Sequence, residues 1–203
     1  MIRRPPRSTL DRSSAASDVY KRQGISLVAH MMSPKIPAFH FNTRFLVTQD
    51  SWFGGGTDMT PTFENEEDTD FFHSSLKGAC DKHDVNYYED FKKNCDEYFY
   101  LPHRNEPRGV GGIFFDHLNT GDWDKDFNFV KEVGGQTLEI INQVVKNKKD
   151  LDWTDEEKDK QLVKRGRYVE FNLIWDRGTL FGLKTGGSTE AILMSMPPEA
   201  KWE

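Results

Sequence analysis

Residues 40–48, HFNTRFLVT, constrain the fold most, because their side chains divide between an apolar and a polar row. Successive side chains of a β-strand point to opposite faces, so this alternation predicts a strand. One face carries Phe41, Thr43, Phe45 and Val47. The other carries His40, Asn42 and Arg44. An unpaired guanidinium is costly to bury, so the polar row predicts either a solvent-facing strand or a pocket floor that pairs with a carboxylate.

A second strand is predicted at residues 24–30, GISLVAH, where Ser26, Val28 and His30 share one face. The Pro-containing segment 31–39 allows the two strands to pair in antiparallel fashion. If they do, the polar rows of both strands lie on the same side of the sheet.

Helix signals follow the glycine-rich run WFGGGTDMTP (52–61), in which Asp58 lies in a short extended piece. Asn65, with acidic residues after it, and the pair Thr154 and Glu157 are typical of helix N-termini. We expect helices over residues 65–80, 84–99, 123–147 and 154–165. We expect the third of these to point inward the side chains of Phe127, Val130, Leu138, Ile141 and Val145.

The C-terminal part is predicted to form strands, at residues 167–175, 179–185 and 189–195. In VEFNLIWDRGTLFG (169–182) the alternation ends at Trp175, and Asp176, Arg177 and Gly178 then favour a hairpin turn. The alternative is a charged pair aimed into a pocket. Strands with inserted helices indicate an α+β fold built on an antiparallel sheet.

Composition narrows the possible partners. The chain has 203 residues, enough for one domain with a sizeable core, and no apolar run approaches the roughly 18 residues of a membrane span. The net charge of −6 argues against nucleic acid, the more so because basic residues concentrate in residues 1–23. That segment has no helical or strand period, so we interpret residues 1–23 as a disordered or adaptor-like artefactual segment and 24–203 as the domain.

Cys80 and Cys95 are expected to be buried thiols.

The chain has six histidines but no HxH or HExxH pair. Separate elements can bring histidines together around a first-row metal, yet for each histidine alone a hydrogen-bonded structural role is favoured. The loop HRNEPRGVGGIFFD (103–116) places two arginines among glycines. It predicts either a connection with surface charges or a loop that faces an anion.

Several long motifs identify a family. WFGGGTDMTP (52–61), FYLPHRNEPRGVGGIFFD (99–116), KRGRYVEFNLIWDRGTLFGL (164–183) and TEAILMSMPPEAKWE (189–203) resemble oxygen-dependent coproporphyrinogen III oxidase. The resemblance runs from Gly24 to Glu203. It implies a large antiparallel sheet flanked by helices on both faces, present here in incomplete form because both ends of the family's chain are expected to be missing.

The resemblance also implies an activity in haem and tetrapyrrole biosynthesis. The family oxidatively decarboxylates two propionates of coproporphyrinogen III to vinyl groups and gives protoporphyrinogen IX. Molecular oxygen is the acceptor, no organic cofactor is needed, and the need for a divalent metal is left open. A homodimer is expected, in the cytoplasm, with mitochondria or plastids as alternatives. Two other readings stay open: an inactive fragment that binds porphyrin or only dimerises, and a histidine-based metal-dependent oxygenase.

Site residues are implied by position in the matching motifs. The resemblance makes His40 the proton donor and Asp176 and Arg177 the acid and base at the reacting propionate and pyrrole. Substrate contacts are implied at Ser26, Asn42, Thr43, Arg44, Asp58, Gly186, Gly187 and Ser188. Metal ligands are implied at His30, His40, His73 and His103. The family usually has Arg where this chain has Ser188, which puts one propionate contact in doubt.

Overall fold

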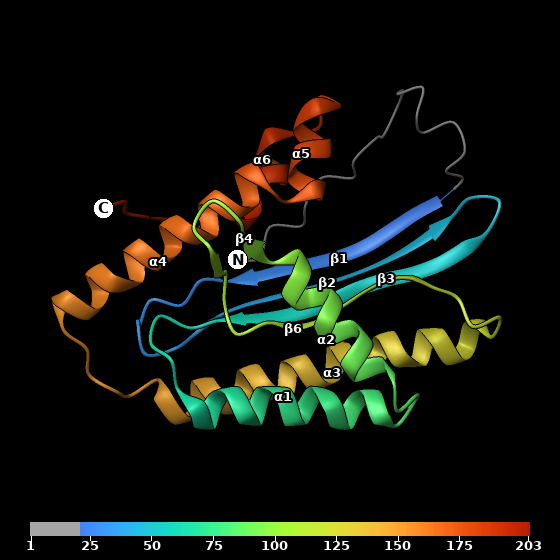
Figure 1. The fold of residues 1–203 in the computed structure, drawn as a ribbon, viewed down its shortest axis with the longest axis horizontal. Coiled ribbons are helices and arrows are strands. Elements are labelled where there is room, and N and C mark those ends of the chain that lie inside the picture. The colour runs from blue at the N-terminus through green and yellow to red at the C-terminus, as the bar shows by residue number, and fades with distance from the viewer. Residues whose placement is uncertain (1–20) are drawn as a thin grey trace, which may run out of the picture.

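The computed structural model describes residues 21–203, and these form a four-stranded antiparallel sheet with helices on both sides (Figure 1). The sheet order is β1-β2-β3-β6, built from β1 (Lys21–Ala29), β2 (Ala38–Val47), β3 (Ser51–Thr60) and β6 (Gly112–Leu118). A small second sheet pairs β4 (Tyr100–Leu101) with β5 (Glu106–Pro107). The predicted α+β class is confirmed. Strand β1 begins at Lys21, so residues 21–23 extend the sheet beyond the predicted boundary, and residues 1–20 lie outside the described part.

Two helices cover one face of the sheet, α1 (Glu66–Asp81) and α3 (Trp123–Lys148) (Figure 1). The main core lies between them and the sheet. Its largest fully buried side chains include Phe39, Met59, Ile113 and Phe115 from the strands and Phe72, Leu76, Phe129 and Ile140 from the helices. Full burial of such a side chain stabilises the fold by about 1.5–3 kcal/mol, so this face holds the sheet together.

Helix α2 (Tyr87–Tyr98) lies along strand β6 and contributes to two clusters. Its Tyr88 packs in the main core, while Cys95 packs in a second cluster with Phe114 of β6. Phe171 of α4 (Asp155–Ile174) completes that second cluster, on the other side of the sheet. Cys80 and Cys95 are buried free thiols, as predicted.

The helix starts predicted at Asn65 and Thr154 are confirmed, whereas the second helix begins at Tyr87 and not at residue 84. Asn65 accepts a hydrogen bond from the backbone N–H of Asp68 and caps α1. Thr154 and Glu157 form a capping box at the start of α4. Each cap satisfies N–H groups that have no partner within the helix, which contributes about 1 kcal/mol.

The strands predicted after residue 166 are wrong, because this part of the chain is helical. Helix α4 continues to Ile174, and α5 (Arg177–Lys184), α6 (Thr189–Ile192) and the short 3₁₀ helix Leu193–Ser195 follow. The buried residues of α4 recur at helical spacing and include Gln161, Arg165, Tyr168 and Phe171. The β-branched and aromatic residues that favour a strand locally are therefore overridden by the capping box and by packing.

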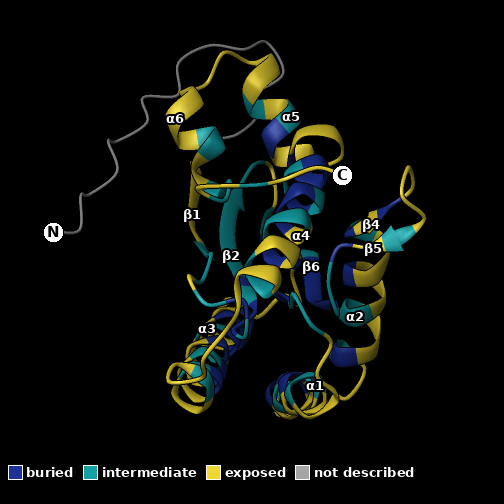
Figure 2. Ribbon diagram, turned by 90° about the vertical axis from the view of Figure 1, so that its left-hand side faces the viewer, coloured by how far each residue is buried: buried dark blue, intermediate teal, exposed yellow. Residues whose placement is uncertain are grey.

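Helices α4 to α6 lie on the side of the sheet opposite α1 and α3 (Figure 1). Exposed residues gather on β1, at one edge of the sheet, and on α5 and α6 (Figure 2). No helix within residues 21–203 is long and apolar enough to cross a bilayer.

Candidate active site

The polar rows predicted on the first two strands lie on one face of the sheet. Ser26 is opposite Asn42 and Val28 is opposite His40 in the antiparallel register. His40 is also opposite Asp58 on β3. Residues directly opposite each other share a face, so the shared polar face predicted from alternation is confirmed. It is the face toward α4.

Arg44 lies on this face, and Gly54 leaves room for its side chain. Its Nη2 donates to Asp116 Oδ2 over 2.7 Å, and its guanidinium lies 5.8 Å from the ring centroids of both Trp52 and Phe114. A Cβ on Gly54 would come within 2.7 Å of Arg44 Nε and 2.8 Å of Asp116 Oδ1. The side chain of Arg44 keeps 29% exposure, so its remaining N–H groups are available to an incoming carboxylate.

His40 contacts the buried ion pair formed by Asp58 and Arg108. Its Nδ1 is 2.6 Å from Asp58 Oδ2, and the other oxygen of Asp58 accepts from Arg108. Burial alone would raise the pKa of Asp58, but Arg108 and His40 lower it below its usual value. At the other ring nitrogen, Asn42 Nδ2 lies 3.3 Å from Nε2. The His40 side chain is 16% exposed and that of Asp58 5%, so the histidine is the member of this group that can reach a ligand.

Asp176 and Arg177 lie at a break between two helices, not in a hairpin. Asp176 is the N-cap of α5 and accepts from the backbone N–H of Thr179 over 2.7 Å. Its other oxygen accepts from the hydroxyl of Tyr98 over 2.8 Å. The Arg177 guanidinium lies 4.7 Å from the Tyr98 ring. The predicted turn is therefore a helix cap, and the adjacent acid and base remain together.

Tyr98 connects this pair to the polar face. Its ring stacks on Phe114 with centroids 4.8 Å apart, and Arg44 contacts the same Phe114 ring. Burial and the neighbouring Asp176 raise the pKa of Tyr98 to about 12, so its hydroxyl stays protonated and donates. Asp176 and Arg44 thus lie on one side of the sheet, with two aromatic rings between them.

Thr43 and the loop after α5 lie apart from the polar row. Thr43 shares the opposite face with Phe41 and Phe45, as alternation requires. Gly186 adopts a φ of 71°, which favours glycine. Ser188 caps the short helix α6 through its bond with the Ala191 N–H, and the loop around it is exposed.

The histidines implied as metal ligands are not brought together. His30 Nε2 lies 2.9 Å from the carbonyl oxygen of Ser195. His73 is bonded on both sides, by the carbonyl of Val110 at 2.9 Å and the hydroxyl of Tyr88 at 3.0 Å. Burial lowers the pKa of both histidines, so both tend toward the neutral form.

His103 is held by a third, separate set of hydrogen bonds. Its Nε2 lies 2.8 Å from Glu170, and its Nδ1 accepts from the Trp175 indole N–H over 2.9 Å. Arg104 also binds Glu170, through two N–H groups. Within residues 21–203, no cluster of three or more His, Cys, Asp or Glu side chains has the arrangement of a metal site. The four implied ligands therefore do not fit a common metal ion in this structure.

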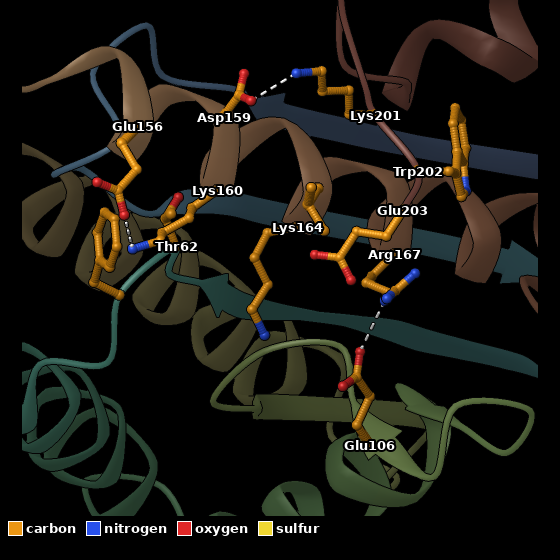
Figure 3. A pocket seen from close by; sticks show the side chains of 12 residues that line it. Thr62, Glu106, Glu156, Asp159, Lys160, Lys164, Arg167, Lys201, Trp202 and Glu203 are labelled. Carbon is orange, nitrogen blue, oxygen red and sulfur yellow. Dashed lines mark hydrogen bonds and ion pairs between the residues drawn. The ribbon is translucent and has the colours of Figure 1, made fainter.

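A separate hollow of about 650 Å³ lies on the outer side of α4, beside the C-terminal residues (Figure 3). Charged side chains of both signs line it, and several are already paired: Arg167 with Glu106 at 3.4 Å and Lys201 with Asp159 at 2.7 Å. None of the residues implied by the sequence lines this hollow. The polar face of the sheet is therefore the better candidate site.

Sequence reasoning missed residues that support the site. Arg108 was one of two arginines in a loop for which surface charges and a facing anion were the two alternatives, and the anion it meets is the buried Asp58. Tyr98 and Asp116 were not singled out, although they bind Asp176 and Arg44. A tyrosine on an apolar helix face is an ordinary core residue by pattern, so the sequence carries no signal for its role.

Comparison with known proteins agrees with the sequence motifs. The family model described as Coproporphyrinogen III oxidase matches residues 3–203, and so reaches into the segment set apart at the N-terminus. The oxygen-dependent coproporphyrinogen-III oxidase of Rickettsia bellii (strain OSU 85-389) is 61% identical over 179 residues, or 88% of this chain and 64% of the relative. That of Rickettsia akari (strain Hartford) is 58% identical over 183 residues, or 90% of this chain and 66% of the relative. The chain thus spans slightly less than two thirds of the length of these relatives.

Proposed function

Since the chain belongs to the coproporphyrinogen III oxidase family, we propose that its polar sheet face binds coproporphyrinogen III for oxidative decarboxylation. Two propionates become vinyl groups, and the product is protoporphyrinogen IX. Because the relatives are longer, the activity is proposed for the chain completed to their length. The observation that carries the proposal is that Arg44, whose side chain is 29% exposed, and His40, 16% exposed, lie on one sheet face.

The chemistry needs carboxylate binding and proton transfer. Each propionate loses carbon dioxide, one β-hydrogen and two electrons. One molecule of oxygen accepts the two electrons and two protons and becomes hydrogen peroxide. The electron-rich pyrrole passes the electrons to oxygen itself, so no organic cofactor is needed.

The residues of this chain fit those tasks. Arg44 and Arg177 each offer a planar fork that suits a propionate. Asp176 accepts the pyrrole N–H proton, and His40 donates a proton to the reduced oxygen. Ser26 and Asn42 add polar contacts from the same face. Asp58 acts indirectly, through its contact with His40. The loop Gly186-Gly187-Ser188 supplies backbone contacts to the substrate.

A divalent metal has no part in this proposal. The histidines implied as its ligands are held in separate hydrogen bonds within the described residues. We therefore route no step through a metal ion. This separation also disfavours the metal-dependent oxygenase among the alternatives.

We further propose a homodimer in the cytoplasm. Helices α4 and α5 and the 3₁₀ helix Leu193–Ser195 expose apolar side chains that favour a protein contact, among them Leu173, Ile174, Phe181, Leu183 and Met194. The bacterial relatives fit a cytoplasmic enzyme. Sedimentation at several concentrations tests the dimer.

The activity is tested by oxygen uptake and carbon dioxide release with coproporphyrinogen III, using the chain completed to its relatives' length. We expect two molecules of carbon dioxide per substrate. Arg44→Gln removes a charged hydrogen bond worth about 1.5–3 kcal/mol and raises KM by roughly tenfold or more. Lys77→Gln, on the outer surface of α1, is the matched control. Tight binding without oxygen uptake would instead support the porphyrin-binding alternative.

A further inference from the structure

Arg108 is buried, and burial of a guanidinium is costly unless a carboxylate compensates its charge. It is 3% exposed and lies against three aromatic rings, with its Cζ 3.9 Å from the Phe99 centroid, 4.4 Å from Tyr168 and 4.9 Å from Phe171. Aromatic faces attract a cation but do not replace its lost hydration. Asp58 supplies the compensating carboxylate.

Asp58 divides its two oxygens between two partners. Oδ1 accepts from Arg108 and Oδ2 faces His40 Nδ1. Asp58 and His40 are directly opposite each other on β2 and β3, so the backbone fixes their approach. A guanidinium only donates and a carboxylate only accepts. The hydrogen between Oδ2 and His40 therefore belongs to Nδ1.

The hydrogen on Nδ1 determines the role of the other ring nitrogen, Nε2. In a neutral imidazole one nitrogen carries hydrogen and the other accepts. With hydrogen on Nδ1, the Nε2 atom of His40 is an acceptor, and Asn42 Nδ2 lies 3.3 Å from it, placed to donate. Asp58 occupies Nδ1, so Nε2 is the ring nitrogen that remains for a ligand.

We infer that Arg108 is a positioning residue, which fixes the Nδ1–H tautomer of His40 by holding Asp58 and so presents Nε2 to the substrate face. The catalytic meaning of this device rests on the proposed function, because it makes Nε2 the atom that takes up a proton from the substrate and then donates it to the reduced oxygen. The tautomer itself does not depend on any activity.

The first test is Asp58→Asn, which keeps the shape of the side chain. Arg108 can meet only the amide oxygen of the new residue, so the amide NH₂ must face His40 Nδ1. The neutral ring then has to carry its hydrogen on Nε2. Two-bond ¹H–¹⁵N correlation spectra of the His40 ring report the tautomer directly. We expect Nδ1–H in the wild type and Nε2–H in Asp58→Asn.

A second substitution isolates Arg108 from Asp58. In Asp58→Asn with Arg108→Met, nothing fixes the amide, and Asn42 favours Nε2 as the acceptor. We expect the Nδ1–H tautomer to return. If the double variant does not fold, the single variant decides alone, since a retained Nδ1–H form there overturns the inference. The same tautomer in both folded variants also overturns it.

Asp116→Asn is the matched control, because Asp116 binds Arg44 on the same face and not His40. It should leave the tautomer of His40 unchanged. In the completed chain, Asp58→Asn should lower kcat by about 10²–10⁴-fold, the usual contribution of a placed general acid, with KM little changed. If the wild type proves inactive, the proposed function fails while the tautomer spectra still decide the inference.

Discussion

At the scale of single residues, Asp176 shows how one side chain serves the fold and the proposed chemistry together. One oxygen accepts the N–H of Thr179 and caps α5, and the other accepts the Tyr98 hydroxyl. Each oxygen keeps a free lone-pair direction for a substrate proton. Loss of activity on mutation is therefore informative only if the cap is preserved.

Asparagine separates the two roles, because Asn and Asp cap helices about equally well. In the completed enzyme, Asp176→Asn should keep the melting temperature and lose turnover by at least about 10²-fold, since a neutral amide cannot accept the pyrrole proton. Substrate affinity should change far less. Asp176→Ala should lose activity and also about 1 kcal/mol of stability with the cap.

The comparison of the two variants decides between the roles. Steady-state kinetics and urea unfolding are measured on both proteins. Turnover of Asp176→Asn within about tenfold of the wild type would leave Asp176 as a helix cap only.

At the scale of elements, Glu170 joins three parts of the chain that are distant in sequence. It lies on α4 and accepts from Arg104 of the β4–β5 hairpin and from the Trp202 indole near the C-terminus. His103 bonds to the same carboxylate. The Arg104 hydrogen bonds are the main cause that lowers the pKa of Glu170 to about 2.

The lowered pKa of Glu170 predicts that the folded chain loses stability as the pH falls. A carboxylate whose pKa is lower in the folded state contributes stability above its unfolded pKa and loses it as pH falls toward the folded value. The unfolded value is 4.5 and the folded value about 2, so the window lies between about pH 5 and pH 2. Because the Arg104 side chain is 37% exposed, solvent screens this interaction, and we expect it to contribute about 1 kcal/mol at neutral pH.

Glu170→Gln should therefore be less stable than the wild type at pH 7, and the difference should shrink below pH 4.5. Urea unfolding at several pH values measures it. Lys160→Gln is a suitable control, since its partner Glu156 on α4 is exposed and such pairs contribute little. A difference that stays constant from pH 7 to pH 3 would contradict the assignment to the Glu170 charge.

Several elements could be predicted because their signals are local. The alternation in β2 gave the polar face, and Asn65 and Thr154 marked the starts of α1 and α4. The inward face of α3 was placed less well: Val130 is buried, but Leu138 is 60% exposed and Phe129 is buried instead. Apolar residues on adjacent positions leave a helix face ambiguous by about one residue.

The C-terminal helices and the buried pair could not be predicted, because both depend on distant contacts. Tyr168 and Phe171 become helical core residues by packing on Arg108, which comes from another part of the chain. Likewise, nothing in the spacing of Asp58 and Arg108 indicates that they meet. The motifs named the site residues, and only the structure shows which of them touch.

At the scale of the whole molecule, the two faces of the sheet have different tasks. The face toward α1 and α3 holds the main apolar core, and the face toward α4 holds the charged and hydrogen-bonding groups of the candidate site. The histidines are distributed over both sides: His73 lies on α1, and His103 lies in the β4–β5 hairpin. Each of the four histidines implied as metal ligands already has a hydrogen-bond partner in the protein, so the folded chain gains nothing by exchanging these bonds for a metal.

Removal of metal should accordingly leave the stability of this chain unchanged. A metal bound at 100 times its Kd would stabilise a protein of this size by about 2.7 kcal/mol, or roughly 5–10 °C in Tm. We expect no such shift when a chelator or zinc is added during thermal unfolding. The positive control is Lys77→His with Asp81→His, which places two imidazoles one turn apart on exposed positions of α1. That variant should gain stability with zinc and lose it with the chelator. A comparable fall in Tm of the unmodified chain on chelation would instead mean that some of its histidines leave their present partners to share a metal ion.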